Sequence, residues 1–210
     1  GHAKIGLAED VTAAVLERKR IEHERDHDIL TGLYNRQAFN RVCTELFAAP
    51  ERMGVAALMM MDLDNLKHIN DTYGHDWGDQ YIRRTGQCLR DNTPAGTVCA
   101  RLSGDEFLVL FHGYRSRDAV REKIDCLTNA MQQSVALLPS GNALHISLSG
   151  GIAWYPDDGQ DWETLKKYAD FAMYQVKHAD KGRVEEFDIG VYNREAYAER
   201  TRREFRQLLS

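Results

Sequence analysis

Two acidic side chains, Asp105 and Glu106, interrupt the stretch RLSGDEFLVLF, residues 101–111. Another acid, Asp62, lies near the end of a continuous apolar run, GVAALMMMDLD, residues 54–64. If the two apolar segments are neighbouring strands, Asp62 and Asp105 meet at one sheet edge, where their carboxylates repel each other unless a cation lies between them. Such oxygen ligands suit Mg²⁺, which proteins hold with one or two carboxylates and substrate phosphates. Taken singly, acids at strand ends are more often solvated turn residues.

The elements that must position these acids alternate between strand and helix patterns. Continuous apolar runs predict strands at residues 54–64 and 145–155, and a hairpin formed by residues 97–102 and 106–111 around a short turn. Helical periodicity predicts helices at about 78–92, 116–137 and 162–178. Helices between strands, together with one hairpin, predict an α/β domain whose mixed central β-sheet is flanked by helices.

Composition excludes several classes of protein. The chain has 210 residues, of which 43% are hydrophobic, enough for one domain with extensions. A net charge of −5 and the lack of a sustained basic run argue against binding to duplex nucleic acid. The four cysteines have no metal-binding spacing and fit reduced thiols, so we expect a cytoplasmic domain, although the full-length protein could be anchored to a membrane. No stretch reaches the roughly 18 apolar residues of a membrane span.

Five segments, in this order, resemble the GGDEF family of diguanylate cyclases: DHDILTGLYNRQAF, DLDNLKHINDTYGHDWGD, RLSGDEF, SLSGGIA and ADFAMYQVK. The resemblance covers about residues 28–187. It implies a sheet flanked by helices, related to the palm of polymerases and of nucleotidyl cyclases. It also implies a reaction that joins two GTP molecules into cyclic di-GMP with loss of two pyrophosphates.

The resemblance further implies a metal site. Asp62 and Asp105 would ligate two Mg²⁺ (or Mn²⁺) ions per GTP site, helped by the backbone carbonyl of Leu63, and Glu106 would belong to the same acidic cluster. Two divalent cations can lower the pKa of the attacking 3'-hydroxyl and neutralise the triphosphate. Lys67 matches a family position that approaches the phosphates.

The remaining matched residues imply recognition of GTP. Asn70 and Asp79 match a guanine-reading pair, and a carboxylate can accept from both N1–H and the exocyclic amine of guanine, which adenine does not offer. Asn70 also suits a turn, and Asp79 the N-terminus of a helix; both structural roles are compatible with base recognition. Ser103 and Gly104, which carry no bulky side chain, would let the hairpin backbone approach the triphosphate.

Lys177 matches a second phosphate-binding position, and the cation that should follow it is ambiguous. Four residues separate Lys177 from Gly182 where many members have two, so that cation is either Lys181 or Arg183.

Two departures from the family pattern bear on activity. Ser103 replaces the first glycine of the signature and could restrict the backbone there. The family's feedback motif, RxxD, would fall on Pro94 and Thr97, which carry no charge, so we expect no product inhibition through that site.

The flanks suggest a fragment of a signalling protein with three parts. Residues 1–28 resemble a signalling helix that follows a PAS sensory domain, 29–187 form the GGDEF domain, and 188–210 resemble a helical linker to an EAL phosphodiesterase domain. One acidic cluster and one guanine-reading pair per chain predict a homodimer for catalysis. The alternative is a weakly active GTP-binding module that regulates an adjacent EAL domain.

Overall fold

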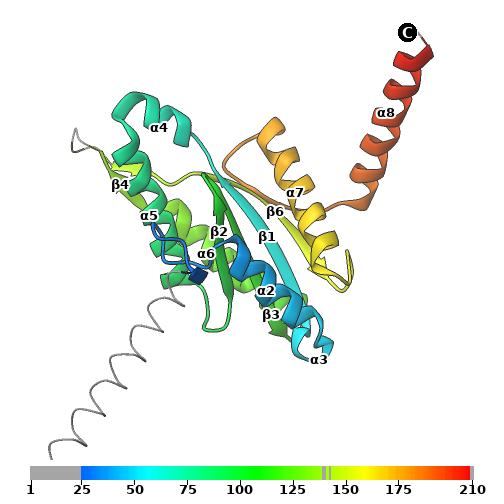
Figure 1. Ribbon diagram of the computed structural model, residues 1–210, viewed down its shortest axis with the longest axis horizontal. Helices are drawn as coiled ribbons and strands as arrows, with labels where there is room; N and C mark the ends of the chain where they lie inside the picture. Colours follow the sequence, from blue (N-terminus) through cyan, green and yellow to red (C-terminus); the bar gives the residue numbers. More distant parts are fainter. Residues whose placement is uncertain (1–24, 139–140, 142, 209–210) are drawn as a thin grey trace, which may run out of the picture.

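The computed structural model describes residues 25–138, 141 and 143–208, with side chains described as far as residue 198 (Figure 1). The main sheet has five strands in the order β2-β3-β1-β6-β7. β1 runs antiparallel to its neighbours β3 and β6, and β7 runs parallel to β6. The strands are β1 (Val55–Leu63), β2 (Val98–Ser103), β3 (Glu106–Tyr114), β6 (Leu148–Tyr155) and β7 (Val184–Glu186). The α/β fold with a mixed sheet, expected from the sequence, is confirmed.

Helices cover both faces of this sheet (Figure 1). One face carries α4 (Leu66–Tyr73), α5 (His75–Asn92) and α6 (Arg117–Gln133), and the other carries α2 (Arg36–Phe47) and α7 (Trp162–Ala179). The short helix α3 (Pro50–Met53) precedes β1, and a two-stranded ribbon, β4 (Val135–Leu137) and β5 (Ala143–His145), lies beside the main sheet. The helix α8 (Ile189–Leu208) projects away from the body in Figure 1.

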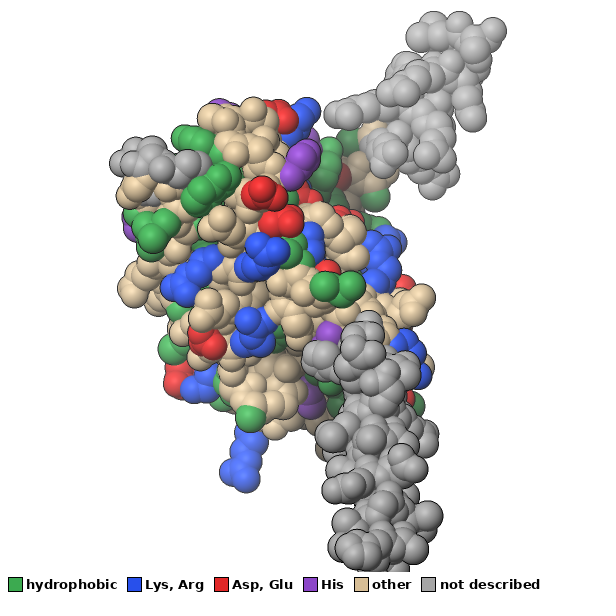
Figure 2. Space-filling model, turned by 60° about the vertical axis from the view of Figure 1, so that its left-hand side comes forward, with side chains coloured by type: hydrophobic (Ala, Val, Ile, Leu, Met, Phe, Trp, Pro, Cys, Tyr) green, Lys and Arg blue, Asp and Glu red, His purple; other side chains and the backbone are tan. Residues whose placement is uncertain are grey.

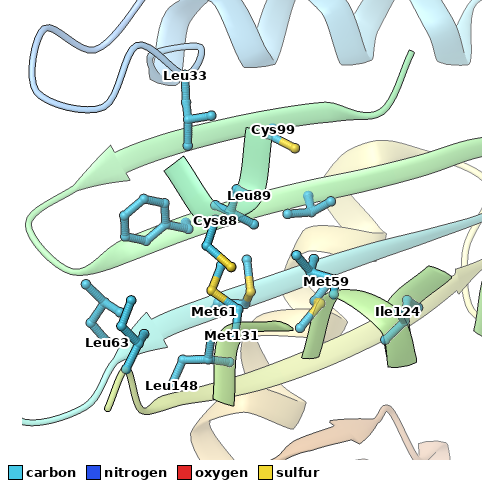
Figure 3. Close-up of a cluster of buried hydrophobic side chains, with 14 of the residues drawn as sticks. Leu33, Met59, Met61, Leu63, Cys88, Leu89, Cys99, Ile124, Met131 and Leu148 are labelled. Atoms are coloured by element: carbon cyan, nitrogen blue, oxygen red, sulfur yellow. The ribbon is translucent and has the colours of Figure 1, made fainter. Parts of the chain in front are cut away.

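The central strand β1 is apolar throughout because both of its faces are buried. Met59 and Met61 point into the core beneath α5 and α6, whereas Leu58 and Met60 point into the core beneath α2 and α7. Figure 3 shows the first of these cores, to which Met59 and Met61 of β1, Cys88 and Leu89 of α5 and Met131 of α6 contribute side chains. The alternation continues to the end of the strand, so Asp62 lies on the same face of β1 as Leu58 and Met60, which is the face that α7 covers.

Helix α7 approaches the sheet most closely at Gly151 of β6. A Cβ atom added there would overlap the backbone carbonyl oxygen of Ala169 and the backbone nitrogen of Met173. Because glycine has no Cβ, the helix backbone lies directly on the strand. This contact fixes the height of α7 above the sheet.

Three boundaries differ from those expected. The helix expected to reach residue 137 ends at Gln133, because Ser134 donates its N–H to Met131 and the next three residues pair with β5 as a strand. The strand expected to run from 145 to 155 is split between β5 and β6. The helix expected from 78 begins at His75, three residues earlier.

Both flanking segments were expected to be helical. α8 confirms a helix after residue 188, and an aromatic cluster holds its base, with the Tyr168 and Phe187 rings stacked at 4.0 Å and Tyr192 against Tyr168 at 5.3 Å. The leader helix lies almost wholly outside the described residues. The three domain boundaries therefore stay a prediction. Among the described residues, no helix is long and apolar enough to cross a membrane.

Candidate functional site

An open cleft of about 570 Å³ lies where the end of β1, the start of α4, the β2–β3 turn and the C-terminal end of α7 meet. Six of the residues expected to form the site line it: Asp62, Leu63, Lys67, Asp105, Lys177 and Lys181. They come from four segments of the chain that only the tertiary fold brings together. The cleft thus brings acidic and basic side chains together.

Asp62 and Asp105, the acids expected to bind metal, lie at the same edge of the sheet, as the sequence predicted. β1 and β3 are neighbours, and the Leu63 N–H donates to the backbone carbonyl of Asp105 at 3.0 Å, which ties the hairpin turn to the end of β1. Burial raises the pKa of the Asp62 carboxyl, and the charge of Asp105 adds to the rise. A hydrogen bond from Lys177 acts in the opposite direction.

Lys177 supplies the positive charge that faces Asp62. Its Nζ lies 2.5 Å from Oδ2 of Asp62, whose side chain is 8% exposed. Lys177 lies in the last turn of α7, so the close packing of this helix on β6 carries the ammonium group to the end of β1. The charge of Lys177 therefore offsets part of the cost that burial and Asp105 impose on the ionised Asp62 carboxyl.

The donor set fits a magnesium or manganese ion that shares its coordination with a nucleotide. No group of three acidic, histidine or cysteine side chains capable of holding a metal occurs within the described part of the chain. Mg²⁺ does not need one, because it commonly binds through one or two carboxylates and completes its shell with phosphate oxygens and water. Asp62 and Asp105, with the carbonyl of Leu63, are such a set.

Glu106 is placed differently from the other acids. It lies opposite Asp62 in the β1–β3 register but lines an adjacent hollow with Lys166 and Asp170 of α7. Ser103 Oγ donates to its Oε2 at 3.1 Å. Burial and the charge of Glu106 raise the pKa of Asp170. The structure thus places Glu106 beside the cleft rather than in its wall.

The signature turn accommodates serine without strain. Ser103 is the last residue of β2 rather than part of the turn, and Gly104 adopts the positive φ of 46°. Among the described residues, Asn65 is the one non-glycine residue with positive φ. The expected restriction of the backbone at Ser103 is therefore absent, because the left-handed conformation falls on the glycine.

Arg101 braces the same turn. Its Nε and Nη2 donate to the carbonyl oxygen of Gly104 at 3.1 and 2.9 Å, and its Nη1 lies 3.2 Å from Oδ2 of Asp28. Burial works to raise the pKa of Asp28, but hydrogen bonds from Thr31 and the charge of Arg101 outweigh it, so the pKa is lowered. The turn that presents Asp105 is held from two sides.

Asn70 and Asp79, which the family resemblance predicts to read guanine, lie on α4 and α5, outside the residues that line the cleft. Asn70 is on α4, three residues after Lys67, so the two side chains are neighbours on the same side of the helix. The side-chain amide of Asn70 lies against the backbone of Gly78 on α5. Asp79 follows Gly78 on α5 and is half-buried. The structural roles first considered for both are wrong: Asn70 lies within a helix rather than in a turn, and Asp79 lies beyond the first turn of α5.

The structure separates the two candidates for the second phosphate cation. Lys181 is exposed and lines the cleft with Lys177. Arg183 forms an ion pair with Glu185 at 3.1 Å and lines a different hollow, between α7 and the base of α8. The geometry brings Lys181, and not Arg183, to the site.

One buried acid in the cleft wall was missed by the sequence reasoning. Asp64 is 3% exposed and accepts hydrogen bonds from the hydroxyls of Ser147 at 2.8 Å and Ser149 at 2.9 Å. The available signal was its position two residues after Asp62, but its serine partners are more than 80 residues away in sequence.

The surface charge agrees with a small anionic ligand. On the face drawn in Figure 2, basic and acidic side chains are interspersed and no broad basic area appears. A nucleotide needs only a few cations, such as the three lysines of the cleft.

Comparisons with known proteins give one consistent result. Residues 25–183 match the family described as diguanylate cyclase, GGDEF domain. Cyclic di-GMP phosphodiesterase NbdA of Pseudomonas aeruginosa is 34% identical over 184 residues, which are 87% of this chain and 23% of NbdA. Diguanylate cyclase DosC of Escherichia coli is 30% identical over 164 residues, which are 78% of this chain and 35% of DosC. The chain thus spans about a quarter to a third of these curated relatives.

A solved structure agrees with the fold. The GGDEF domain of TpbB (YfiN) from Pseudomonas aeruginosa aligns with a TM-score of 0.71 and 32% identity, covering 78% of this chain and 95% of that structure.

Proposed function

Since the chain belongs to the diguanylate cyclase GGDEF domain family, we propose that it condenses two GTP molecules into cyclic di-GMP and releases two pyrophosphates. The observation that carries the proposal is the cleft that gathers Asp62 and Asp105 with Lys67, Lys177 and Lys181. Carboxylates that can bind divalent cations and ammonium groups that can bind phosphates, gathered in one cleft, match the chemistry of a triphosphate bound with divalent cations.

Each group in the cleft has a role in this proposal. Asp62 and Asp105, with the carbonyl of Leu63, would hold two Mg²⁺ or Mn²⁺ ions, which when bound would activate the 3'-hydroxyl and neutralise charge on the phosphates. Lys67 and Lys181, both exposed, are free to turn toward the phosphates. Lys177 would exchange its contact with Asp62 for one with phosphate oxygens.

The first experiment is incubation with GTP and Mg²⁺, followed by chromatographic detection of cyclic di-GMP. Product that is lost when EDTA is added supports the cyclase. The second candidate, a regulatory GTP-binding module, is favoured by the similarity to NbdA, which is named as a phosphodiesterase. GTP binding without any product under these conditions would support that candidate instead.

Guanine recognition gives a prediction of its own. In the presence of Ca²⁺, used to slow turnover, calorimetry should show GTP binding at least tenfold more tightly than ATP. Asp79→Ala should remove most of this difference, because an unpaired recognition group costs about 1 to 3 kcal/mol. Asp91→Ala, an exposed acid near the end of the same helix, is the matched control and should retain the preference. Equal affinity of the wild type for both nucleotides would exclude Asn70 and Asp79 as a guanine reader.

Feedback gives another prediction. Residues 94–97 form a tight turn in which the Thr97 N–H donates to the Pro94 carbonyl at 3.1 Å, and neither side chain carries a charge. Cyclic di-GMP added at the start of the reaction should therefore leave the initial rate unchanged at saturating GTP, because a phosphodiester has no arginine to bind there. Non-competitive inhibition of the wild type by added product would show that another feedback site exists.

The wider context stays part of the proposal. A PAS domain before the leader and an EAL domain after α8 are inferred from sequence resemblance of the flanks. We propose a homodimer because the described part of the chain has one cleft with Asp62 and Asp105, whereas the product contains two guanosines.

A further inference from the structure

A buried hydroxyl links the metal-site strand to the segment that carries Lys181. Ser149 of β6 is fully buried, and its Oγ donates to Oδ1 of Asp64 at 2.9 Å. The same Oγ accepts from the backbone N–H of Gly182 at 3.3 Å. Gly182 directly follows Lys181, so one hydroxyl joins the end of β1 to the backbone beside the cleft lysine.

Asp64 is well suited to be the fixed end of this link. It lies two residues after Asp62, and its backbone N–H donates to the carbonyl of Ser147 at 2.9 Å. The Ser147 hydroxyl donates to its other carboxylate oxygen, Oδ2, at 2.8 Å. A carboxylate held on both oxygens and on its backbone is rigid, so the Ser149 hydroxyl has a defined direction.

The segment that the link holds is short and otherwise exposed. Residues 180–183 connect α7 to β7, and Gly182 adopts a positive φ of 84°. A second contact, from the Gly150 N–H to the Arg183 carbonyl at 2.9 Å, fixes the end of this connection nearer β7. The Ser149 hydroxyl therefore fixes the part next to Lys181.

We propose that Ser149 is a positioning residue that, through Asp64 and the backbone of Gly182, holds Lys181 in place for the terminal phosphates of the nucleotide. Prior ordering of the backbone reduces the entropy that a long, exposed lysine loses when it binds phosphate. The inference rests on the proposed function, because it takes the ligand of the cleft to be a nucleoside triphosphate. It concerns a residue that makes no contact with the ligand itself.

The test compares affinities for GTP and GMP, measured by calorimetry with Ca²⁺, in the wild type and in Ser149→Ala, Lys181→Ala and the double variant. Ser149→Ala should weaken GTP binding by about threefold to tenfold and leave GMP binding unchanged, because GMP lacks the phosphates that Lys181 would reach. The double variant should bind GTP no more weakly than Lys181→Ala alone, since Ser149 acts through that lysine.

Two further variants separate positioning from general stability. Ser147→Ala removes a hydrogen bond to the same carboxylate but none to Gly182, and should weaken GTP binding less than Ser149→Ala does. If Ser149→Ala does not fold, Ser149→Cys keeps the size of the side chain with a weaker acceptor and should show the same selective loss.

Several results would overturn the inference. Additive losses in the double variant, equal losses for GTP and GMP, or an equal effect of Ser147→Ala would each show that Ser149 does not act through Lys181. If the wild type makes cyclic di-GMP and Lys181→Ala binds GTP normally, this inference fails while the proposed function stands. If the wild type binds no GTP, both fail.

Discussion

Replacing Asp62 or Asp105 with asparagine should lower the rate of cyclic di-GMP formation by about 100-fold or more. Each change keeps the size of the side chain but removes a negative charge that the metal ions need, so the charge developing on the phosphates loses its stabilisation. Initial rates measured by chromatography over a range of Mg²⁺ concentrations provide the test. Turnover at the wild-type rate in either variant would remove that residue from the proposed metal site.

Loss of activity in these variants should not reflect unfolding. Because burial and the neighbouring acids raise the pKa of Asp62, its ionised form is less favourable in the folded protein than in the unfolded chain. This cost exists above the folded-state pKa and disappears as pH falls and the carboxyl is protonated. Asp62→Asn should therefore melt at the same temperature as the wild type or higher at pH 7. Asp118→Asn, which alters a side chain that is 94% exposed on α6, is the control and should retain activity.

The second large effect concerns concentration. Specific activity should rise with protein concentration and, well below the dimer dissociation constant, should fall about tenfold for each tenfold dilution, as mass action requires for a reaction that needs two copies. The reason is that the described chain presents one cleft with Asp62 and Asp105, whereas the product contains two guanosines. The 3'-hydroxyl of one GTP must then attack the α-phosphate of a GTP held by a second copy, across a two-fold axis.

A forced dimer is the matching gain-of-function experiment. Fusing a stable coiled coil before Val11 should keep specific activity high on dilution, because the effective concentration of the second domain is then set by the linker. The same fusion with polar residues at the core positions of the coiled coil serves as control. Constant activity per molecule on dilution, with light scattering that reports only monomer, would show that one copy is sufficient.

Much of the architecture could be predicted because it depends on local patterns. An apolar run buried on both faces identifies β1, and two runs around a short polar turn identify the hairpin. These two elements bring Asp62 close to Asp105 without knowledge of the remaining fold. The end of α6 was missed because Val135 and Leu137 continue an apolar pattern, and pairing with β5 decides their conformation.

The details of the site depend on contacts that sequence spacing does not encode. Glu106 follows Asp105 directly and lies opposite Asp62 in the register, yet its side chain lines a neighbouring hollow with Lys166 and Asp170 of α7. Lys181 and Arg183 look equivalent in sequence, and only the path of the chain between α7 and β7 separates them. Asp64 gave no signal as a buried residue because its serine partners, Ser147 just before β6 and Ser149 on β6, are distant in sequence.

The close contact between the α7 backbone and Gly151 makes residue 151 far more sensitive to mutation than a glycine outside the cleft would be expected to be. In a saturation library, Gly151→Ala should be depleted under selection for signalling almost as strongly as Asp62→Asn, although Gly151 does not line the cleft. Any side chain there pushes α7 outward, and Lys177 moves with it. A genetic screen would therefore record a packing defect as a catalytic one, and tolerance to substitution in this protein will not map simply onto distance from the cleft.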